Sequence, residues 1–593
     1  MLDTGIWPES KSFDDAGFGP PPKKWKGICQ FKNNFTCNNK IIGARYYHHE
    51  GNTSEGNAAS PLDTIGHGTH TASTAGGRPA ANASLGGLAD GLARGGVPSA
   101  RIAVYKVCWD NGCSDADILA GFDDAIAEGV DIISISIGGG SSEYFSDSIA
   151  IGSFHATKNG VLASCSAGNA GPSASSVGNF APWMFTVAAS TIDRKFIAET
   201  KLGSGKVYQG RALNTFGGNG KMFPLIYGGN APNRSSGVDG SNFCTIGSLD
   251  ERLVKGKVVI CEAADTGFAQ RLAGAVATIM QTDRPNDFAF EFELPASVLG
   301  VDDVTQIIQY SNKTKNPTAS VSKSQGVFDG AAPYVVSFSS RGPNPLTPNI
   351  LKPDIVAPGV DILAAWSPLS GETPGALYNI ISGTSMSCPH ASGAAAYVKS
   401  FHPTWSPAAV KSALLTTAYV MSSRKNKEAE LAYGAGHINP VAAVKPGLVY
   451  DAAEIDYVKF LCGQGYTTKN LRLITGDNSS CTAATNGTVF DLNYPSFALS
   501  VINITKPISQ TFHRTVTNVG AANSTYRASV SAPAGLKITV EPEELSFEAL
   551  LEKKTFALKI EGEVRKTSTV LSAALIWSDE THHVRSPIAV FAS

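Results

Sequence analysis

The stretch RIAVYKVCWDNGCSDADILAGFDDAIAEGVDIISISIG, residues Arg101–Gly138, decides the fold class of this 593-residue chain. Its two ends, Arg101–Val107 and Val130–Gly138, are short apolar segments rich in β-branched residues, which is typical of buried strands. Between them, Asp117–Gly129 has helical periodicity and ends in Gly, a common signal for a helix C-terminus. A strand, a helix of about a dozen residues and a second buried strand together predict a parallel strand pair joined by a crossover helix.

The same alternation continues after this unit. Ser148–Gly160 is a second predicted helix that ends in Gly, and Val161–Asn169 and Met184–Ser190 are further predicted strands. Apolar strands separated by helices predict an α/β domain whose parallel sheet is covered on both faces. Ligands of such sheets bind beyond the carboxyl ends of the strands, so functional residues are expected there.

The pattern of predicted strands and helices changes twice along the chain. Strands and turns dominate from about residue 202 to residue 321, which indicates an inserted module, and the α/β texture returns at residues 341–359. Short alternating strands at regular spacing end the chain and predict a β-sandwich. The expected domains are an α/β domain at 1–201 and 322–450, an inserted domain at 202–321, a connecting region at 451–490 and a β-sandwich at 491–593.

Composition and cysteine spacing restrict the function and the compartment. The net charge is −2, from 48 basic and 50 acidic residues, which gives no reason to expect nucleic acid or an anionic membrane as partner. No apolar run reaches the length of a transmembrane helix. Cys165 and Cys388 stand alone in apolar surroundings and are expected to be free buried thiols. The other eight cysteines form close pairs that predict local disulfides: Cys29/Cys37, Cys108/Cys113, Cys244/Cys261 and Cys462/Cys481.

Glycosylation sequons agree with the paired cysteines. Together the two features favour the secretory route, where such sequons mark exposed loops. The first ten residues, MLDTGIWPES, have neither a basic start nor an apolar core and are no signal peptide. The cysteines and sequons therefore indicate an extracellular protein, although the sequence shows no secretion signal. The sequons begin at Asn34, Asn52, Asn82, Asn233, Asn312, Asn478, Asn486, Asn503 and Asn523.

Three short motifs carry reactive side chains, and each has an ordinary structural interpretation. Asp3 in LDTGIWPES is compatible with a turn. His67 in GHGTHTAST forms a helical pair with His70, but no Glu follows and no third ligand is evident, so a zinc site is not expected. Ser385 in GTSMSCPH is compatible with a helix N-cap.

Taken together, the three motifs predict nucleophilic catalysis. A Ser hydroxyl needs a base within hydrogen-bond reach, and that base needs a carboxylate to fix its tautomer. Asp3, His67 and Ser385 supply these groups, each close to a Gly that lets a substrate backbone approach. Acyl transfer also needs donors for the oxyanion, and the side chain of Asn169 and the backbone N–H of Ser385 can supply them.

The segments LDTGIWPES, GHGTHTAST, SAGNAGP and GTSMSCPH resemble the signature segments of subtilisin-like serine proteases. KWKGICQ…FTCNNKIIGARYY and YGAGHINPVAAVKPGLVYD are similar to the plant branch, the cucumisin-like enzymes, and the resemblance covers nearly the whole chain. It implies a serine endopeptidase that hydrolyses extended polypeptides through an acyl-enzyme and needs no cofactor. It assigns the triad to Asp3, His67 and Ser385 and the oxyanion donor to Asn169.

The resemblance also implies a substrate cleft and the identity of the accessory domains. The inserted stretch is similar to a protease-associated domain, through which relatives sometimes form homodimers, and the C-terminal sandwich to a fibronectin-III-like domain. The full-length form is expected in the apoplast or cell wall. The residues implied in substrate binding are Ser134, Ser136, Ile137 and Gly138, which pair with the substrate backbone, and Ser164, Ser166, Ala167 and Gly168, which form a pocket wall.

One departure from the family pattern concerns the start of the chain. Only Met1 and Leu2 precede Asp3, so the first strand is expected to be truncated and to hold the carboxylate poorly. We therefore expect this polypeptide alone to fold badly or to have weak activity. The alternative function is a truncated, catalytically weak protease-like protein that binds peptides or partners.

Three further groups suggest other chemistry. A thiol nucleophile at Cys388 is disfavoured because the Gly-Thr-Ser-Met frame places Ser385 at the helix start. Asp110–Asp117 resembles a calcium loop but lacks the spaced ligands and the terminal Glu. The neighbouring Asp123 and Asp124 are expected to be a solvated helix face. No metal site is therefore expected.

Overall fold

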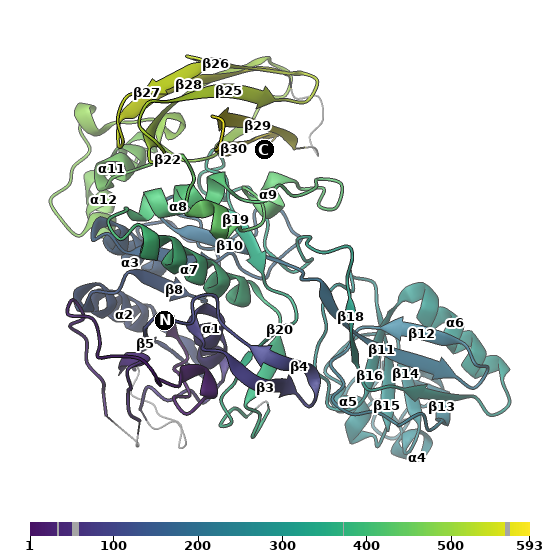
Figure 1. Cartoon of the computed structure of the whole chain (residues 1–593). Coiled ribbons are helices and arrows are strands. Elements are labelled where there is room, and N and C mark those ends of the chain that lie inside the picture. The colour runs from purple at the N-terminus through teal and green to yellow at the C-terminus, as the bar shows by residue number, and fades with distance from the viewer. Residues whose placement is uncertain (32–34, 50–58, 372, 564–569, 593) are drawn as a thin grey trace.

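The computed structural model describes residues 1–31, 35–49, 59–371, 373–563 and 570–592. Figure 1 shows three lobes: an α/β domain in the middle, an inserted lobe beside it and a β-sandwich above it. Within the described ranges, no helix is both long and apolar enough to cross a bilayer.

A seven-stranded sheet forms the centre of the α/β domain, in the order β19-β10-β9-β8-β1-β5-β2, and all its neighbours are parallel. The predicted parallel sheet is therefore confirmed. Its strands are β1 (Leu2–Asp3), β2 (Ile41–Tyr46), β5 (Ile102–Lys106), β8 (Ile132–Ile135), β9 (Leu162–Ser166), β10 (Phe185–Ser190) and β19 (Ile355–Pro358). Most residues of these strands are buried because both faces of the sheet are covered.

Helices cover the two faces, and the alternation of side chains along the strands shows which helices lie on which face. Ala163 of β9 packs with α2 (Asp115–Glu128) and α3 (Ser148–Lys158). Its neighbour Leu162 packs with α7 (Thr384–Phe401) and α8 (Pro407–Thr416) on the other face. The expected helices at 117–129 and 148–160 are thus present with ends shifted by one or two residues. Helix α1 (His67–Gly76) packs along α7.

The short first strand lies in the interior of the sheet. Leu2 is fully buried and pairs with Tyr105 of β5 and Ile135 of β8. The backbone N–H of Val107 donates to the carbonyl of Asp3 at 3.0 Å. The expectation that two residues hold Asp3 poorly is wrong for this structure, because the ladders on both sides supply the anchoring that the strand's length does not. The effect of this chain start on folding and activity stays a prediction.

The inserted lobe is built on an eight-stranded sheet and extends beyond the predicted range 202–321. The lobe begins at Arg194 and ends at Phe328, because β11 pairs with both β17 and β18. The lobe also contains three helices in a stretch where strands and turns were expected; the longest, α6, buries only the narrow stripe of Val304 and Ile307. Its elements are β11 (Arg194–Leu202), β12 (Val207–Gly210), β13 (Phe223–Tyr227), α4 (Glu251–Val254), β14 (Val258–Cys261), α5 (Phe268–Leu272), β15 (Ala277–Thr282), β16 (Ala296–Gly300), α6 (Val301–Lys313), β17 (Thr318–Val321) and β18 (Gln325–Phe328).

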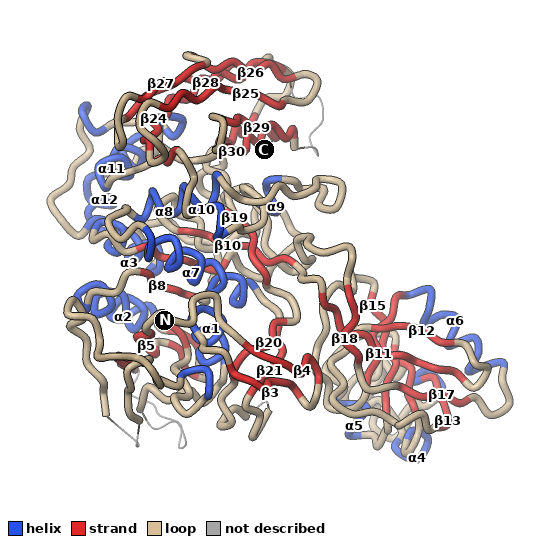
Figure 2. Tube along the Cα trace, viewed as in Figure 1, coloured by secondary structure: helices blue, strands red, loops and turns tan. Residues whose placement is uncertain are grey.

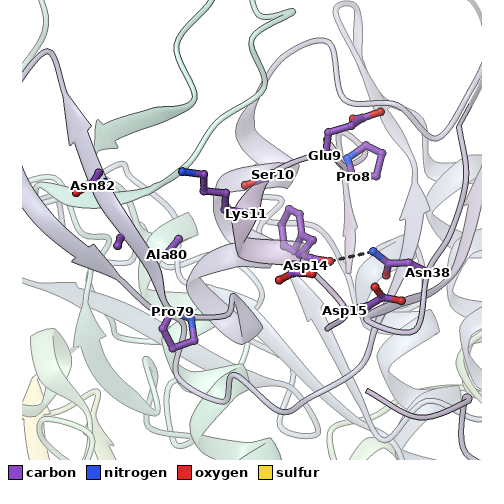
Figure 3. Close-up of a pocket in the computed structure, with 12 residues that line it drawn as sticks. Pro8, Glu9, Ser10, Lys11, Asp14, Asp15, Asn38, Pro79, Ala80 and Asn82 are labelled. Atoms are coloured by element: carbon purple, nitrogen blue, oxygen red, sulfur yellow. Dashed lines mark hydrogen bonds between the residues drawn. The ribbon is translucent and has the colours of Figure 1, made fainter. Parts of the chain in front are cut away.

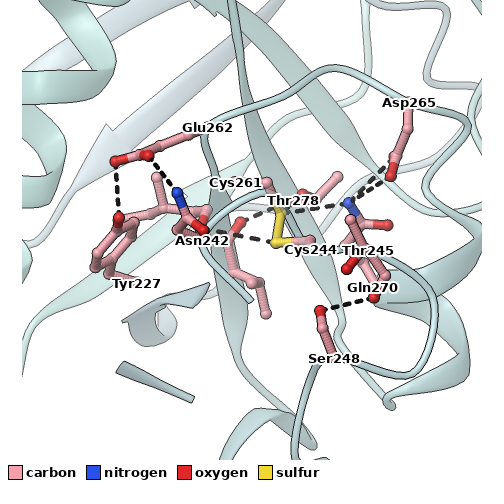
Figure 4. Close-up of a disulfide and its surroundings, with 12 residues drawn as sticks. Tyr227, Asn242, Cys244, Thr245, Ser248, Cys261, Glu262, Asp265, Gln270 and Thr278 are labelled. Atoms are coloured by element: carbon pink, nitrogen blue, oxygen red, sulfur yellow. Dashed lines mark hydrogen bonds between the residues drawn. A yellow bond between two sulfur atoms is a disulfide. The ribbon is translucent and has the colours of Figure 1, made fainter. Parts of the chain in front are cut away.

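The cysteines pair as their spacing predicts, and Cys165 and Cys388 are free and buried. Figure 4 shows the bridge between Cys244 and Cys261, which joins a loop of the inserted lobe to the end of β14. Beside it, Glu262 accepts hydrogen bonds from the Tyr227 hydroxyl at 2.7 Å and the Asn242 amide at 2.8 Å. The disulfide and these bonds order a long loop that has little regular structure. The four bonded pairs are Cys29–Cys37, Cys108–Cys113, Cys244–Cys261 and Cys462–Cys481.

The Cys29–Cys37 bridge lies at the edge of the α/β domain. Cys37 and Cys29 are both partly buried and pack against an apolar cluster that includes Phe35 and Ile41. Cys29 also forms a parallel bridge with Ala44 of β2, the last strand in the order of the central sheet. Cys37 therefore serves the fold, by tying a loop to this edge strand, and is no part of the candidate active site.

The C-terminal lobe is a sandwich of two sheets, in the orders β22-β24-β28-β26 and β23-β30-β29-β25-β27 (Figure 2). Its strand β22 comes from residues 448–450, so the sandwich reaches outside the predicted range 491–593. Trp577 and Tyr526 are among its fully buried core residues. Its strands are β22 (Leu448–Tyr450), β23 (Phe497–Val501), β24 (Ile508–Asn518), β25 (Ser524–Ser531), β26 (Leu536–Glu541), β27 (Glu544–Phe547), β28 (Lys553–Gly562), β29 (Leu571–Ser578) and β30 (His583–Ala592).

Shorter elements connect these lobes. The connecting region forms two helices that pack near α3 and are clipped by Cys462–Cys481. The remaining elements are β3 (Ala80–Leu85), β4 (Leu88–Ala93), β6 (Cys108–Trp109), β7 (Gly112–Cys113), β20 (Ile362–Ala365), β21 (Tyr378–Ile381), α9 (Glu430–Tyr433), α10 (Pro440–Ala443), α11 (Glu454–Gly463) and α12 (Thr468–Thr475).

A buried ionic cluster joins the α/β domain to the segment that leads into the sandwich. The Lys352 ammonium lies 2.7 Å from the Asp354 carboxylate, and both side chains are fully buried. The Tyr494 hydroxyl donates to the other oxygen of Asp354 and accepts from Lys411 at 3.1 Å. Burial lowers the pKa of Lys411 to about 7. The cluster fixes the relative position of the two lobes only while its charges stay paired.

We expect Asp354→Asn to lower the free energy of unfolding by roughly 3–5 kcal/mol, because the substitution leaves a buried ammonium without its counter-charge. Urea denaturation followed by tryptophan fluorescence measures the loss. The control is Glu251→Gln, which removes the exposed i,i+4 partner of Lys255 and is expected to cost under about 1 kcal/mol. Equal denaturation midpoints for the two variants would show that the cluster does not hold the lobes together.

Candidate active site

Asp3 and His67 form a close hydrogen-bonded pair at the carboxyl end of β1. The Nδ1 of His67 lies 2.7 Å from Oδ1 of Asp3, whose side chain is only 4% exposed, against 28% for His67. The Thr4 backbone N–H donates to the same oxygen at 2.8 Å, and the Thr71 hydroxyl donates to Oδ2 at 2.9 Å. A carboxylate acceptor fixes the imidazole proton on Nδ1, so Nε2 carries the lone pair and can act as a base.

A second carboxylate, Asp63, sets the position of this pair. It is fully buried and accepts from the Thr4 hydroxyl at 2.9 Å, the Gly66 N–H at 2.8 Å and the Thr69 N–H at 2.9 Å. It therefore ties the residue after Asp3 to the first turn of α1, where free N–H groups favour an anion. Sequence reasoning missed Asp63, although an acidic residue just before GHGTH at the start of a predicted helix is a recognisable signal.

Gly66 allows His67 to begin the helix at this place. Its φ is +103°, and a Cβ at this position would lie 2.3 Å from the indole ring of Trp366. Any other residue would need both a rare backbone conformation and a displaced tryptophan. Steric constraints therefore explain why position 66 is a glycine, in addition to the room that a glycine would leave for a substrate.

Ser385 is the second residue of α7. The N-cap is Gly383, which has an extended backbone and no side chain to cap the helix, so the interpretation of Ser385 as an N-cap is wrong. Pro389 has no N–H to donate to the carbonyl of Ser385, and this carbonyl accepts instead from the Ser136 hydroxyl at 2.8 Å. The Ser385 hydroxyl lies 3.4 Å from the carbonyl of Ser136. The proline therefore connects the start of α7 to the loop after β8.

The side chain of Asn169 is oriented by the residue before Ser385. Its Oδ1 accepts from the Thr384 N–H and from the Thr384 hydroxyl, both at 2.9 Å. Because a backbone N–H can only donate, Oδ1 must face Thr384 and the Nδ2 amide group must face away from it. The Thr384 hydroxyl also accepts from the Gly168 N–H at 3.1 Å. An exposed amide donor and the first turn of α7 thus lie next to each other.

The candidate substrate-binding residues separate into two groups. Ile137 and Gly168 are partly exposed and Gly138 is exposed. The Ser134 hydroxyl accepts from Ser392 at 2.7 Å, and the Ser164 hydroxyl donates to the carbonyl of Cys388 at 3.3 Å, so both side chains face α7. The buried side chain of Ser164 is therefore not an accessible pocket wall. The predicted backbone pairing of Ser134 with a substrate stays a prediction, because the orientation of its side chain does not test it. The other buried members are Ser136, Ser166 and Ala167.

The described residues do not support a thiol nucleophile or a metal site. The Cys388 thiol is fully buried under the carbonyl of Ser164, and burial raises its pKa, so a reactive thiolate is disfavoured. His70 bonds the carbonyl of Ile362 through Nε2, and burial lowers its pKa to about 3. Asp124 accepts from the Tyr47 hydroxyl at 2.7 Å. Among the described residues, no group of three or more His, Cys, Asp or Glu side chains is placed to hold a metal ion.

A polar hollow of about 500 Å³ lies on the surface near residues 8–15 (Figure 3). It is lined by Lys11, Asp14, Asn38 and the sequon residue Asn82, and the Asn38 amide donates to the carbonyl of Phe13 at 2.9 Å. None of the candidate catalytic residues lines it. The hollow is therefore separate from the candidate site.

Known proteins are similar to this chain over most of its length. The family model described as "Subtilase family" matches residues 1–436, and that of a "Fibronectin type-III domain" matches residues 491–590. The chain is 51% identical to Subtilisin-like protease SBT4.6 and 50% identical to Subtilisin-like protease SBT4.3, both of Arabidopsis thaliana. Each alignment covers 100% of this chain and 81% of the relative. A crystal structure of a psychrophilic subtilisin-like protease from an Antarctic Pseudoalteromonas aligns at 19% identity and a TM-score of 0.33, over 68% of this chain and 87% of that one.

We expect Thr384→Val to slow phosphonylation of Ser385 by a fluorophosphonate probe roughly tenfold, because the amide of Asn169 loses one of the donors that orient it. Thr384→Ser keeps the hydroxyl and is expected to react at nearly the rate of the unmodified protein. Probe labelling followed over time measures both rates, and melting temperatures show whether the variants remain folded. Equal rates for the Val and Ser variants would contradict an orienting role of this hydroxyl.

Proposed function

The chain belongs to the subtilase family of serine peptidases, and we propose that it is an endopeptidase whose catalytic triad is Asp3, His67 and Ser385. The observation that carries the proposal is the 2.7 Å contact between Asp3 Oδ1 and His67 Nδ1, which prepares the imidazole as a base. It occurs at the carboxyl end of a strand in a parallel sheet, where active sites of such domains lie.

The packing of α1 against α7 supports a position of His67 close to Ser385. His70 in α1 bonds the carbonyl of Ile362, which pairs with Ile381 just before α7. At the other end of α1, a Cβ on Gly393 would lie 3.0 Å from the carbonyl of Ala75. The two helices therefore run in the same direction. Ala75 and Gly393 each follow the candidate catalytic residue by eight positions, so the two helix starts are level.

In the proposed reaction, the Ser385 hydroxyl attacks the scissile carbonyl while His67 Nε2 takes its proton. Asp3 stabilises the imidazolium that forms. The Nδ2 group of Asn169 and the backbone N–H of Ser385 donate to the oxyanion of the tetrahedral intermediate. Collapse of the intermediate breaks the peptide bond, the imidazolium protonates the leaving amine, and an acyl-enzyme remains. Water, deprotonated by His67, then hydrolyses the ester.

The substrate is proposed to be an extended polypeptide. Gly138 and the neighbouring Gly139 and Gly140 are exposed, and a Cβ added at any of them would meet no atom within 4 Å. This open backbone edge suits pairing with a peptide strand, which gives affinity that depends little on sequence. Ile137 and Gly168 are partly exposed and are the candidates for contacts with side chains of the substrate.

We further propose that the inserted lobe is a protease-associated domain that can mediate homodimers, and that the protein is a secreted glycoprotein of the apoplast or cell wall. Four disulfides and the sequons support secretion, because disulfides persist in oxidising compartments. Asn34 and Asn52 lie outside the described residues. Asn233 is partly exposed, and the other six sequon residues are exposed: Asn82, Asn312, Asn478, Asn486, Asn503 and Asn523.

Fluorophosphonate labelling combined with peptide cleavage tests the proposed function. We expect the unmodified protein to label and to cleave, and Ser385→Ala and His67→Ala to do neither, because nucleophile and base act as a unit. Asn169→Ala is expected to keep a trace of activity, roughly 100- to 1,000-fold lower, the cost of losing the oxyanion asparagine in subtilisin.

Ser387→Ala is the matched control, since Ser387 lies in the same turn of α7 but is fully buried. Full turnover by Asn169→Ala would refute the oxyanion assignment. Peptide binding without labelling or cleavage would favour the alternative of a protease-like binding protein.

A further inference from the structure

The turn that leads to Ser385 is joined to a second turn at the end of a two-stranded ladder. Strands β20 and β21 are antiparallel, and Ile362 pairs with Ile381 at this end. Just beyond that pair, the Asp361 N–H donates to the Ser382 hydroxyl at 2.8 Å, and the same hydroxyl donates to Oδ1 of Asp361 at 3.3 Å. Ser382 precedes Ser385 by three residues. Asp361 is therefore attached to the segment that carries the candidate nucleophile.

Close backbone contacts strengthen this attachment. The Gly383 N–H donates to the carbonyl of Gly359 at 2.8 Å. A Cβ on Gly359 would lie 2.8 Å from the carbonyl oxygen of Gly383 and 2.1 Å from the hydroxyl oxygen of Ser387 in α7. The turn at residues 359–361 thus packs directly against the start of α7. A displacement of this turn would therefore displace the residues that lead to Ser385.

The inserted lobe contacts Asp361 through two donors. Ala289, which lies between β15 and β16, donates its N–H to Oδ1 of Asp361 at 3.1 Å. Arg194 of β11 donates from its guanidinium to the carbonyl of Asp361 at 2.7 Å. The segment that carries Ala289 is itself fixed, because the Asp287 carboxylate accepts from the N–H and the hydroxyl of Ser337, both at 2.7 Å. Side chain and backbone of Asp361 are therefore both bound to the inserted lobe.

Burial and backbone conformation make Asp361 hard to replace. The residue is fully buried and has a φ of +54°, a left-handed conformation that Asp, Asn and Gly adopt more readily than other residues. Its Oδ1 accepts both from Ala289 of the inserted lobe and from Ser382 of the nucleophile turn. A buried donor that loses its acceptor costs free energy, so both donors constrain the carboxylate. One oxygen therefore connects the inserted lobe to the turn before Ser385.

We propose that Asp361 is a positioning residue through which the inserted lobe holds the turn that places Ser385 for attack. The inference rests on the proposed function and adds a residue that acts on the nucleophile from outside the triad. Asp361 does not touch the substrate in this proposal. It fixes the start of α7, and a displacement of a nucleophile by about 1 Å can slow a reaction by as much as roughly 100-fold.

The test compares Asp361→Gly with Asp361→Asn. Both replacements accept a positive φ, so the backbone can stay as it is, but only Asn keeps an acceptor for Ala289 and Ser382. A fluorophosphonate probe in large excess gives two quantities: the rate constant of labelling and the final labelled fraction. We expect Asp361→Gly to lower the rate constant roughly tenfold while the labelled fraction stays complete. Asp361→Asn is expected to stay within about threefold of the unmodified protein.

Peptide cleavage and two further variants complete the test. For Asp361→Gly, kcat is expected to fall by the same factor as the labelling rate and KM to change less than about twofold, because the open backbone at residues 138–140 is untouched. Arg194→Met removes the other donor of the inserted lobe and is expected to slow labelling in the same direction. Asp329→Ala is the matched control, because Asp329 is a buried carboxylate beside the same lobe that lies 3.5 Å from Lys195. It is expected to keep the labelling rate.

Two outcomes would overturn the role of Asp361 and leave the proposed function standing. The first is an equal labelling rate constant for Asp361→Gly and Asp361→Asn. The second is a lower labelled fraction of Asp361→Gly at an unchanged rate constant, which would show that the residue serves folding alone. A lack of labelling in the unmodified protein, or labelling that Ser385→Ala retains, would remove the proposed function and this inference together.

Discussion

The candidate site depends on a two-residue strand held in the interior of a parallel sheet. Leu2 pairs with strands on both sides, and this pairing places the carboxylate of Asp3 at the end of the sheet. Asp63 then joins the residue after Asp3 to the first turn of α1. The distance between Asp3 and His67 is thus determined by backbone ladders and by a buried carboxylate with several donors. The backbone therefore positions both Asp3 and His67, so their contact does not depend on flexible side chains.

The start of α7 supplies the other half of the site in a similar way. The first turn of α7 has N–H groups without intrahelical acceptors, and Pro389 frees the carbonyl of Ser385 for Ser136. Thr384 uses its N–H and hydroxyl to orient Asn169. The internal proline therefore provides a contact between α7 and the loop after β8. Local cost in helix stability is exchanged for fixed geometry, which favours catalysis by preorganised donors.

The three lobes are joined by buried charged groups as well as by apolar packing. The Lys352–Asp354 pair and Tyr494 connect the α/β domain to the sandwich, while Asp287 and Asp361 connect it to the inserted lobe. Hydrogen bonds to buried carboxylates depend on direction, so these junctions specify orientation where apolar contacts alone would permit sliding.

The sequence by itself determined the parallel sheet and the local cysteine pairs, and it predicted Asp3, His67, Asn169 and Ser385 as the candidate catalytic residues. These follow from apolar periodicity, short sequence separations and motifs whose chemistry needs particular residue types. It did not reveal the anchoring of β1, the role of Asp63, the extension of the inserted lobe to Arg194 and Phe328, or the inward orientation of Ser134 and Ser164. Only the tertiary structure decided these, because each depends on contacts between segments far apart in the chain. Strand pairing, burial and the donors around a carboxylate are properties of neighbours in space, and local sequence does not record them.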